Sequence, residues 1–166
     1  MWKSQQIARW STMTNKELLA IAVKTLGNRG AEARAYCGLK AGQAWCDAYV
    51  TWLYFKGGVK ELFCKGTKQT YCPNTIKICR SLYAQIPLYL AMTMDFIFFD
   101  WNNNGVPDHI GVVEKRVSTS SIKTIEGNTN GGVVARKTRP SRYVLAVFRP
   151  HFKGEFAIGQ ITVDGV

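Results

Sequence analysis

Hydrophobic residues recur at helical spacing in three segments of the first half of the chain. The first segment begins with Thr14 and Glu17, whose spacing predicts a capping box, and it ends at Gly27. A second apolar pattern runs over residues 44–55, and a third begins after Asn74, a candidate N-cap. The first half of the chain is therefore predicted to be helical.

Beyond residue 95 the pattern changes to short apolar runs, which are typical of β-strands. The first run, residues 96–99, is continuously apolar and predicts a buried strand. Four further strand candidates, separated by short turns, cover residues 109–116, 121–126, 132–138 and 143–149. Short turns join antiparallel neighbours, so we expect an α+β fold in which N-terminal helices pack on a C-terminal antiparallel β-sheet of about five strands.

The chain of 166 residues has the length of one compact domain. Residues 1–13 are polar and are expected to be flexible, residues 14–150 to form the domain, and residues 151–166 to begin a linker. The longest apolar stretch, residues 86–99, is interrupted by Asp95 among others. No segment is long enough to span a bilayer, and we expect no membrane insertion.

Basic residues outnumber acidic residues two to one. The chain has 22 Lys and Arg against 11 Asp and Glu, a formal net charge of +11. Such a charge attracts polyanions such as nucleic acid, an anionic membrane or an anionic cell wall, although any single lysine is explained by a solvated surface. No zinc-finger or helix-turn-helix signature occurs, so no specific nucleic acid is expected. Residues 1–15 lack the apolar core of a signal peptide, which predicts synthesis in the cytoplasm without a secretion signal.

Cys46 stands apart from the other four cysteines because it lies at the start of the second predicted helix. The helix dipole and the free backbone N–H groups there favour a thiolate, whereas a small buried apolar residue is the alternative interpretation. No histidine is near Cys64, Cys72 or Cys79, and no Cys-x-x-Cys motif occurs, which argues against a zinc site. No cofactor is expected to be required.

His109 is better placed than His151 to act on a thiol, because it opens a predicted strand directly after a turn. A histidine on the sheet that meets a cysteine at a helix start can hold the thiol proton and pass it to a leaving amine. Glu126 and Asn128, on one face of the next strand, are candidates to orient the imidazole. A structural histidine, a solvated glutamate and a turn asparagine are the alternatives.

Four motifs occur in an order that is found in one enzyme family. They are Trp-Cys-Asp-Ala-Tyr-Val-Thr-Trp at 45–52, Asp-Phe-Ile-Phe-Phe-Asp at 95–100, Asp-His-Ile-Gly-Val-Val-Glu at 108–114 and Thr-Ile-Glu-Gly-Asn-Thr at 124–129. Through them the chain resembles the CHAP family (cysteine, histidine-dependent amidohydrolase/peptidase). The resemblance implies a papain-like fold and cleavage of bacterial peptidoglycan, as in phage and prophage endolysins. The implied activity is that of an N-acetylmuramoyl-L-alanine amidase or of a stem- or cross-bridge-peptide endopeptidase.

The resemblance also implies roles for single residues. Cys46 becomes the nucleophile, His109 the base, Glu126 the orienting acid and Asn128 a further polar member. The chain departs from the family at two positions, since Trp45 replaces the frequent Gln before the nucleophile and Met94 replaces the usual Gly before Asp95. The expected oxyanion donors are the backbone N–H of Cys46 and, as a second candidate, the side chain of Gln43.

The loop that joins the first two predicted strands has the oxygen spacing of a calcium-binding loop. Asp100, Asn102, Asn104 and Asp108 occupy positions one, three, five and nine, with glycine at position six. Gly111 stands where an EF-hand carries its bidentate Glu. The four residues are therefore a candidate but incomplete Ca²⁺ site, and a turn whose Asn side chains bind their own backbone is the alternative.

The expected partners are bacterial peptidoglycan and anionic wall polymers, reached after release from the cytoplasm. Residues 163–166, Val-Asp-Gly-Val, resemble the opening of a peptidoglycan-binding repeat and are interpreted as the start of a truncated wall-binding domain. Two other functions remain open. One is a non-catalytic basic module that binds wall polymer or nucleic acid, and the other is a thiol isopeptidase that acts on proteins.

Overall fold

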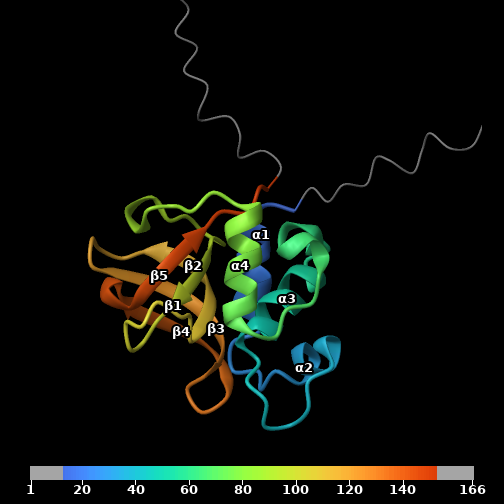
Figure 1. Ribbon diagram of the computed structural model, residues 1–166. Coiled ribbons are helices and arrows are strands. Elements are labelled where there is room, and N and C mark those ends of the chain that lie inside the picture. Colours follow the sequence, from blue (N-terminus) through green and yellow to red (C-terminus); the bar gives the residue numbers. More distant parts are fainter. Residues whose placement is uncertain (1–12, 153–166) are drawn as a thin grey trace, which may run out of the picture.

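Four α-helices precede five β-strands in the computed structural model, which describes residues 13–152 (Figure 1). The helices are α1 (Asn15–Lys24), α2 (Ala31–Cys37), α3 (Cys46–Lys56) and α4 (Cys72–Leu82). The strands are β1 (Phe96–Phe99), β2 (His109–Arg116), β3 (Ser121–Thr129), β4 (Val133–Pro140) and β5 (Val144–Phe148). This order confirms the α+β class. The predictions for residues 1–12 and 153–166 lie outside the described residues.

The five strands form one antiparallel sheet in the order β4-β3-β2-β1-β5. All five predicted strands are present, although β3 extends to Thr129 and β4 begins at Val133. The last strand, β5, pairs with β1, which is the first strand along the chain. Figure 1 shows the sheet on one side of the molecule and the helices on the other.

Alternation along the strands divides the hydrophobic side chains between two faces of the sheet. Phe96 and Phe98 of β1 belong to the main core with the helices, whereas Ile97 and Phe99 belong to a smaller cluster on the opposite face. The segment that precedes β1 covers this smaller cluster with side chains such as Leu88. Both faces of β1 are therefore fully buried, which explains its continuous apolar sequence.

The helix ends follow local signals to different degrees. The capping box of α1 is confirmed, because the Glu17 N–H donates to Thr14 Oγ1 at 3.2 Å and the Thr14 N–H donates to Glu17 Oε2 at 2.7 Å. The prediction of Asn74 as an N-cap is wrong, since α4 begins two residues earlier at Cys72. Pro73 lies in the first turn of α4, where a residue without an N–H is tolerated.

Helix α2 was not predicted from the sequence. Its seven residues lie between Gly30 and Gly38, which both adopt left-handed backbone angles, with φ of 72° and 71°. Seven residues make only two turns, which is too short for a periodic pattern to be distinguished from a loop.

Met94 adopts a left-handed backbone conformation, with φ of 69°, directly before β1. A glycine adopts this conformation without strain, so a methionine at this position must be held in it by its surroundings. In this chain the Met94 side chain is fully buried and its carbonyl accepts the Tyr54 hydroxyl at 2.8 Å. Packing and this hydrogen bond offset the strain, so the turn into β1 is retained.

Helix α3 lies against the sheet at a point where no side chain fits between them. A Cβ atom on Gly127 of β3 would lie 2.4 Å from Tyr49 Cβ and 2.8 Å from the ring of Trp45. Nine consecutive residues of α3, from Cys46 to Tyr54, are buried. The absent side chain at Gly127 therefore sets how closely α3 approaches β3.

We expect Gly127→Ala to lower the free energy of unfolding by about 1–3 kcal/mol, because the added methyl group overpacks the contact with Tyr49 and Trp45. Urea denaturation measures the change. Thr119→Ala, in the exposed turn between β2 and β3, is the control and should change stability by less than about 0.5 kcal/mol. Equal stability of the two variants would contradict the close contact.

Candidate active site

The structure brings Cys46, His109 and Glu126 together from three different elements. Cys46 is the first residue of α3, His109 is the first residue of β2, and Glu126 lies in β3. His109 Nε2 lies 2.9 Å from Glu126 Oε2, and the imidazole also lies close enough to the Cys46 thiol for each to shift the pKa of the other. Because Nε2 is taken by Glu126, the other ring nitrogen, Nδ1, is the one that serves Cys46.

The three side chains differ in their access to solvent. Cys46 and His109 are each 7% exposed, whereas Glu126 is 0% exposed. The thiol and the imidazole thus reach the molecular surface, and the carboxylate lies behind them. This is the order needed for a nucleophile, a proton carrier and an orienting group.

Several neighbours favour the ionised form of Cys46. The largest effect is a hydrogen bond from the Cys72 thiol, and although burial opposes it, His109 and the Ile110 backbone N–H add to it. The pKa of Cys46 is therefore well below its ordinary range. The Ile110 N–H is available because the β2–β3 ladder begins only at Val112.

His109 and Glu126 are both held in their charged forms. Burial lowers the pKa of His109, but hydrogen bonds to Cys46 and Glu126 outweigh it and raise the pKa to about 9. Burial raises the pKa of Glu126, but Arg139, His109 and Thr124 outweigh it and lower the pKa to about 2. These shifts favour a thiolate, an imidazolium and a carboxylate in the site.

Arg139 of β4 and Thr124 of β3 fix the carboxylate of Glu126. Arg139 Nε donates to Oε1 at 2.9 Å, its Nη2 donates to Oε2, and the Thr124 hydroxyl donates to Oε1 at 2.6 Å. The guanidinium of Arg139 also lies over the ring of Trp101, 4.7 Å from its centroid. Sequence reasoning missed Arg139 because the signal that places it near Glu126 is the β3–β4 register, in which Arg139 pairs with Ile122.

Trp101 forms an aromatic wall beside the histidine. Its ring stacks on Phe99 at 5.1 Å between centroids and lies 5.9 Å from the ring of His109. The side chain is 37% exposed. One edge of the site is therefore a partly exposed aromatic surface, which sequence reasoning did not single out.

Among the described residues, neither of two other candidates hydrogen-bonds to Cys46, His109 or Glu126, which we call the relay. Asn128 has a left-handed backbone, with φ of 57°, and the β3–β4 register shifts between Glu126 and Thr129. This irregularity interrupts the expected alternation, and within residues 13–152 the Asn128 side chain makes no hydrogen bond to His109. Gln43 is exposed in the loop before α3, where its Oε1 accepts the Lys40 N–H at 2.7 Å. The roles predicted for these two residues stay predictions.

The candidate calcium residues bind the backbone of their own loop. The Asp100 carboxylate accepts the N–H groups of Asn104 and Gly105, and Asp108 Oδ2 accepts the Trp101 N–H at 2.7 Å. The side-chain oxygens of Asn102 and Asn104 likewise accept backbone N–H groups two residues ahead. These contacts correspond to the turn that was the alternative interpretation. Among the described residues no three His, Cys, Asp or Glu side chains cluster so as to hold a metal ion, and calcium binding stays a prediction.

Two further groups adjoin Cys46, and neither was expected from the sequence. Cys72, the first residue of α4, places its Sγ 3.7 Å from Cys46 Sγ. Asp47 is 1% exposed, and neither carboxylate oxygen has a hydrogen-bond partner within the described part of the chain. Burial and the negative charge of Cys46 raise the pKa of Asp47 to about 7, although Cys72 and Thr75 lie close enough to oppose the shift.

No protein-family model matches the chain, and no curated protein is significantly similar to it. None of the helices between residues 13 and 152 is long and apolar enough to cross a membrane. The chemistry of the site therefore follows from its own residues.

We expect the rate at which iodoacetamide alkylates Cys46 to rise less steeply between about pH 6 and pH 8 than that of an ordinary thiol, because the pKa of Cys46 is lowered. Cys37 is the internal control, since burial raises its pKa to about 11. Its rate should be low and rise about tenfold per pH unit. Mass spectrometry of the labelled peptides reports both rates, and a Cys46 rate that climbs in parallel with that of Cys37 would refute the thiolate.

Arg139→Met should lower the free energy of unfolding by about 3 kcal/mol at neutral pH, because it removes a cationic partner from the buried Glu126. The pKa of Glu126 is lowered from 4.5 to about 2, so its stabilising effect is present above pH 4.5 and is lost as the pH falls through 2. The difference in the free energy of unfolding between Arg139→Met and the wild type should therefore become smaller as the pH falls.

Arg136→Met is the matched control for this change. Arg136 also binds a carboxylate through two nitrogens, but its side chain is 40% exposed and its partner is Glu114 near the surface. The loss should be below about 1 kcal/mol. Urea denaturation at neutral and acid pH measures both variants, and equal losses would mean that the burial of Glu126 has no energetic consequence.

Proposed function

We propose that the protein is a cysteine amidase or peptidase that hydrolyses amide bonds of bacterial peptidoglycan. The observation that carries this proposal is the buried relay of Cys46, His109 and Glu126, charged in the sense that activates a thiol. The nucleophile at a helix start and the histidine at the start of a strand in a later antiparallel sheet support a papain-like fold.

In this mechanism the Cys46 thiolate attacks the carbonyl carbon of the scissile amide. The His109 imidazolium donates its proton to the leaving amine as the C–N bond breaks, and a thioester remains on Cys46. Water then attacks the thioester while His109 accepts its proton, and the carboxylic acid product leaves the thiolate restored. Glu126 holds the imidazole in position and stabilises its charge throughout.

The N-terminus of α3 supplies a donor for the oxyanion of the tetrahedral intermediate. The first intrahelical hydrogen bond of α3 runs from the Tyr49 N–H to the Trp45 carbonyl, so the helix does not use the Cys46 N–H. This N–H is next to the attacking sulfur, where the oxyanion forms. The amide nitrogen of Gln43 is the second proposed donor.

The substrate class rests on the CHAP-like motifs and on charge. The four motifs contain all three relay residues, and a net charge of +11 favours binding to anionic wall polymers. The proposed activity is that of an N-acetylmuramoyl-L-alanine amidase or that of a stem- or cross-bridge-peptide endopeptidase. The enzyme acts on the wall after its release from the cytoplasm.

The relay favours an enzyme over a binding module. Binding alone does not require a fully buried carboxylate that is linked through an imidazole to a thiol near the surface, whereas nucleophilic catalysis does. A thiol isopeptidase that acts on proteins uses the same relay, so only the substrate distinguishes it from a wall hydrolase.

The test is digestion of purified Gram-positive peptidoglycan, with mass spectrometry of the released fragments. Wild-type protein should release fragments whose new amino termini identify the cleaved bond. Cys46→Ala should reduce the rate at least about 10⁴-fold, since it removes the nucleophile. Cys37→Ala, which changes a cysteine that is not in contact with His109, should retain the wild-type rate.

Other outcomes would support the competing functions. Cleavage of protein isopeptides without cleavage of several wall types would establish an isopeptidase. Binding to sacculi that survives Cys46→Ala, with no fragments from any wall, would establish a binding module. Circular dichroism of Cys46→Ala ensures that a lost activity does not reflect a lost fold.

A further inference from the structure

Two cysteine sulfurs lie almost in contact at the candidate nucleophile. Cys46 Sγ and Cys72 Sγ are 3.7 Å apart, and each cysteine is the first residue of its helix. A disulfide requires about 2.05 Å, so the sulfurs need to approach by only about 1.7 Å. The N-terminal ends of α3 and α4 therefore hold two thiols in van der Waals contact.

The two thiols are chemically unequal. The pKa of Cys46 is lowered, as described above, whereas a hydrogen bond to Cys46, burial and the charge of Asp47 raise the pKa of Cys72. A thiolate beside a protonated thiol is the combination found where one cysteine is oxidised and the other resolves the product. The thiolate reacts with the oxidant, and the neighbouring thiol remains available for the second step.

We propose that Cys46 is a site of reversible oxidation, at which a hydroperoxide oxidises the nucleophile and Cys72 captures it as a Cys46–Cys72 disulfide. The disulfide removes the thiolate, so the hydrolase is inactive until a dithiol reduces it. The loss of activity rests on the proposed function, but the formation of the disulfide does not.

The reaction balances with the hydroperoxide as the only oxidant. The thiolate attacks one peroxide oxygen, the O–O bond breaks, and Cys46 becomes a sulfenic acid. The departing oxygen takes the proton of the His109 imidazolium and leaves as water or an alcohol. Cys72 then attacks the Cys46 sulfur, the S–S bond forms, the S–O bond breaks, and hydroxide leaves as water with the proton from Cys72. Two thiols are oxidised and one hydroperoxide is reduced.

Asp47 supplies the base that the second step requires. Its carboxylate is buried beside Cys72 and has no hydrogen-bond partner in the part of the chain that the structure describes. The hydrolytic mechanism gives this carboxylate no role. It is placed to accept the Cys72 proton during the attack and to release it to the departing hydroxide.

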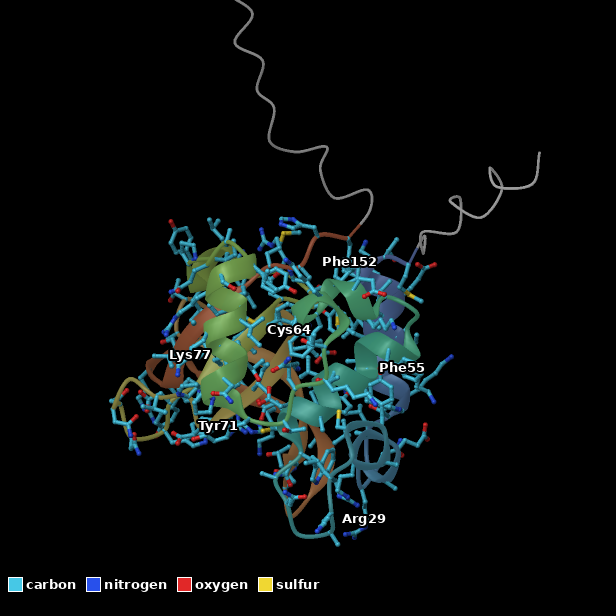
Figure 2. All side chains as sticks on the ribbon, turned by 45° about the vertical axis from the view of Figure 1, so that its right-hand side comes forward. Arg29, Phe55, Cys64, Tyr71, Lys77 and Phe152 are labelled. Atoms are coloured by element: carbon cyan, nitrogen blue, oxygen red, sulfur yellow. The ribbon has the colours of Figure 1, made fainter. Side chains whose placement is uncertain are left out.

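A second thiol pair offers a control within the same chain. Cys64 Sγ and Cys79 Sγ are 4.0 Å apart, and the two residues are 1% and 0% exposed. Cys79 lies seven residues beyond Cys72 on α4, about 10 Å along the helix axis. In Figure 2, Cys64 lies beside the middle of α4, whereas Tyr71 marks the end of α4 that carries Cys72. The groups of the described chain that shift the pKa of Cys79 include no histidine, so hydroperoxide should oxidise this pair more slowly.

The test treats the full chain with one equivalent of hydrogen peroxide, alkylates the remaining thiols and maps the peptides by mass spectrometry. The expected product links the peptides of Cys46 and Cys72, leaves Cys64 and Cys79 alkylated, and returns to free thiols with dithiothreitol. Wall hydrolysis should disappear and return in parallel. Separate alkylation of Cys46 and Cys72 after oxidation, or a Cys64–Cys79 link formed first, would overturn the proposal.

Variants separate the two steps. In Cys72→Ser the sulfenic acid of Cys46 has no resolving thiol, so it should proceed to sulfinic acid, and dithiothreitol should not restore the thiol. Asp47→Asn should still form sulfenic acid, which dimedone traps, but should form the disulfide more slowly. Cys37→Ser should behave as the wild type. The wild-type peptide map decides the proposal even if a variant fails to fold.

The outcomes also separate this proposal from the proposed function. A Cys46–Cys72 disulfide in a protein that cleaves no wall would refute the hydrolase and leave the oxidation site intact. Wall cleavage that survives hydrogen peroxide with no disulfide formed would refute the oxidation site and leave the hydrolase intact.

Discussion

The close contact between α3 and β3 is the constraint on which the site depends. Gly127 lets Tyr49 and Trp45 of the helical layer lie directly on the strand, and Cys46 at the start of α3 is thereby brought to the sheet. Glu126, the neighbour of Gly127, points to the opposite face. There Gly111 of β2 leaves the space it needs, because a Cβ atom on Gly111 would lie 2.7 Å from Glu126 Cγ. Two residues without side chains thus position both ends of the relay.

Charge compensation then couples the members of the relay. Arg139, Glu126, His109 and Cys46 alternate in sign, and each buried charge is stabilised by the next one along the series. A buried charge without a partner is expensive, so the protonation state of one member depends on that of its neighbours. Asp47 is the exception, since within residues 13–152 it forms no ion pair, and burial together with the charge of Cys46 raises its pKa.

The sequence predicts the features that local patterns determine. The capping box at Thr14, the buried strand at 96–99 and the cysteine at a helix start all depend on residues close together in the chain. Features that depend on register or helix placement are not predictable in this way. Arg139 reaches Glu126 only through the β3–β4 pairing, and Cys72 reaches Cys46 only because α4 lies beside α3. Asn128 shows the same limit, since an irregular strand breaks the alternation from which its position was predicted.

The contact between Cys46 and Cys72 has two opposite consequences. A thiol that donates to a thiolate stabilises the charge, which lowers the pKa of the proposed nucleophile. The same short distance places a second sulfur where it can bond to the first once that sulfur is oxidised. A serine at position 72 would keep a hydrogen-bond donor and remove the second sulfur. Cys72 is the first residue of α4. The position of that helix therefore sets both the pKa of Cys46 and the protection that we propose for it against irreversible oxidation.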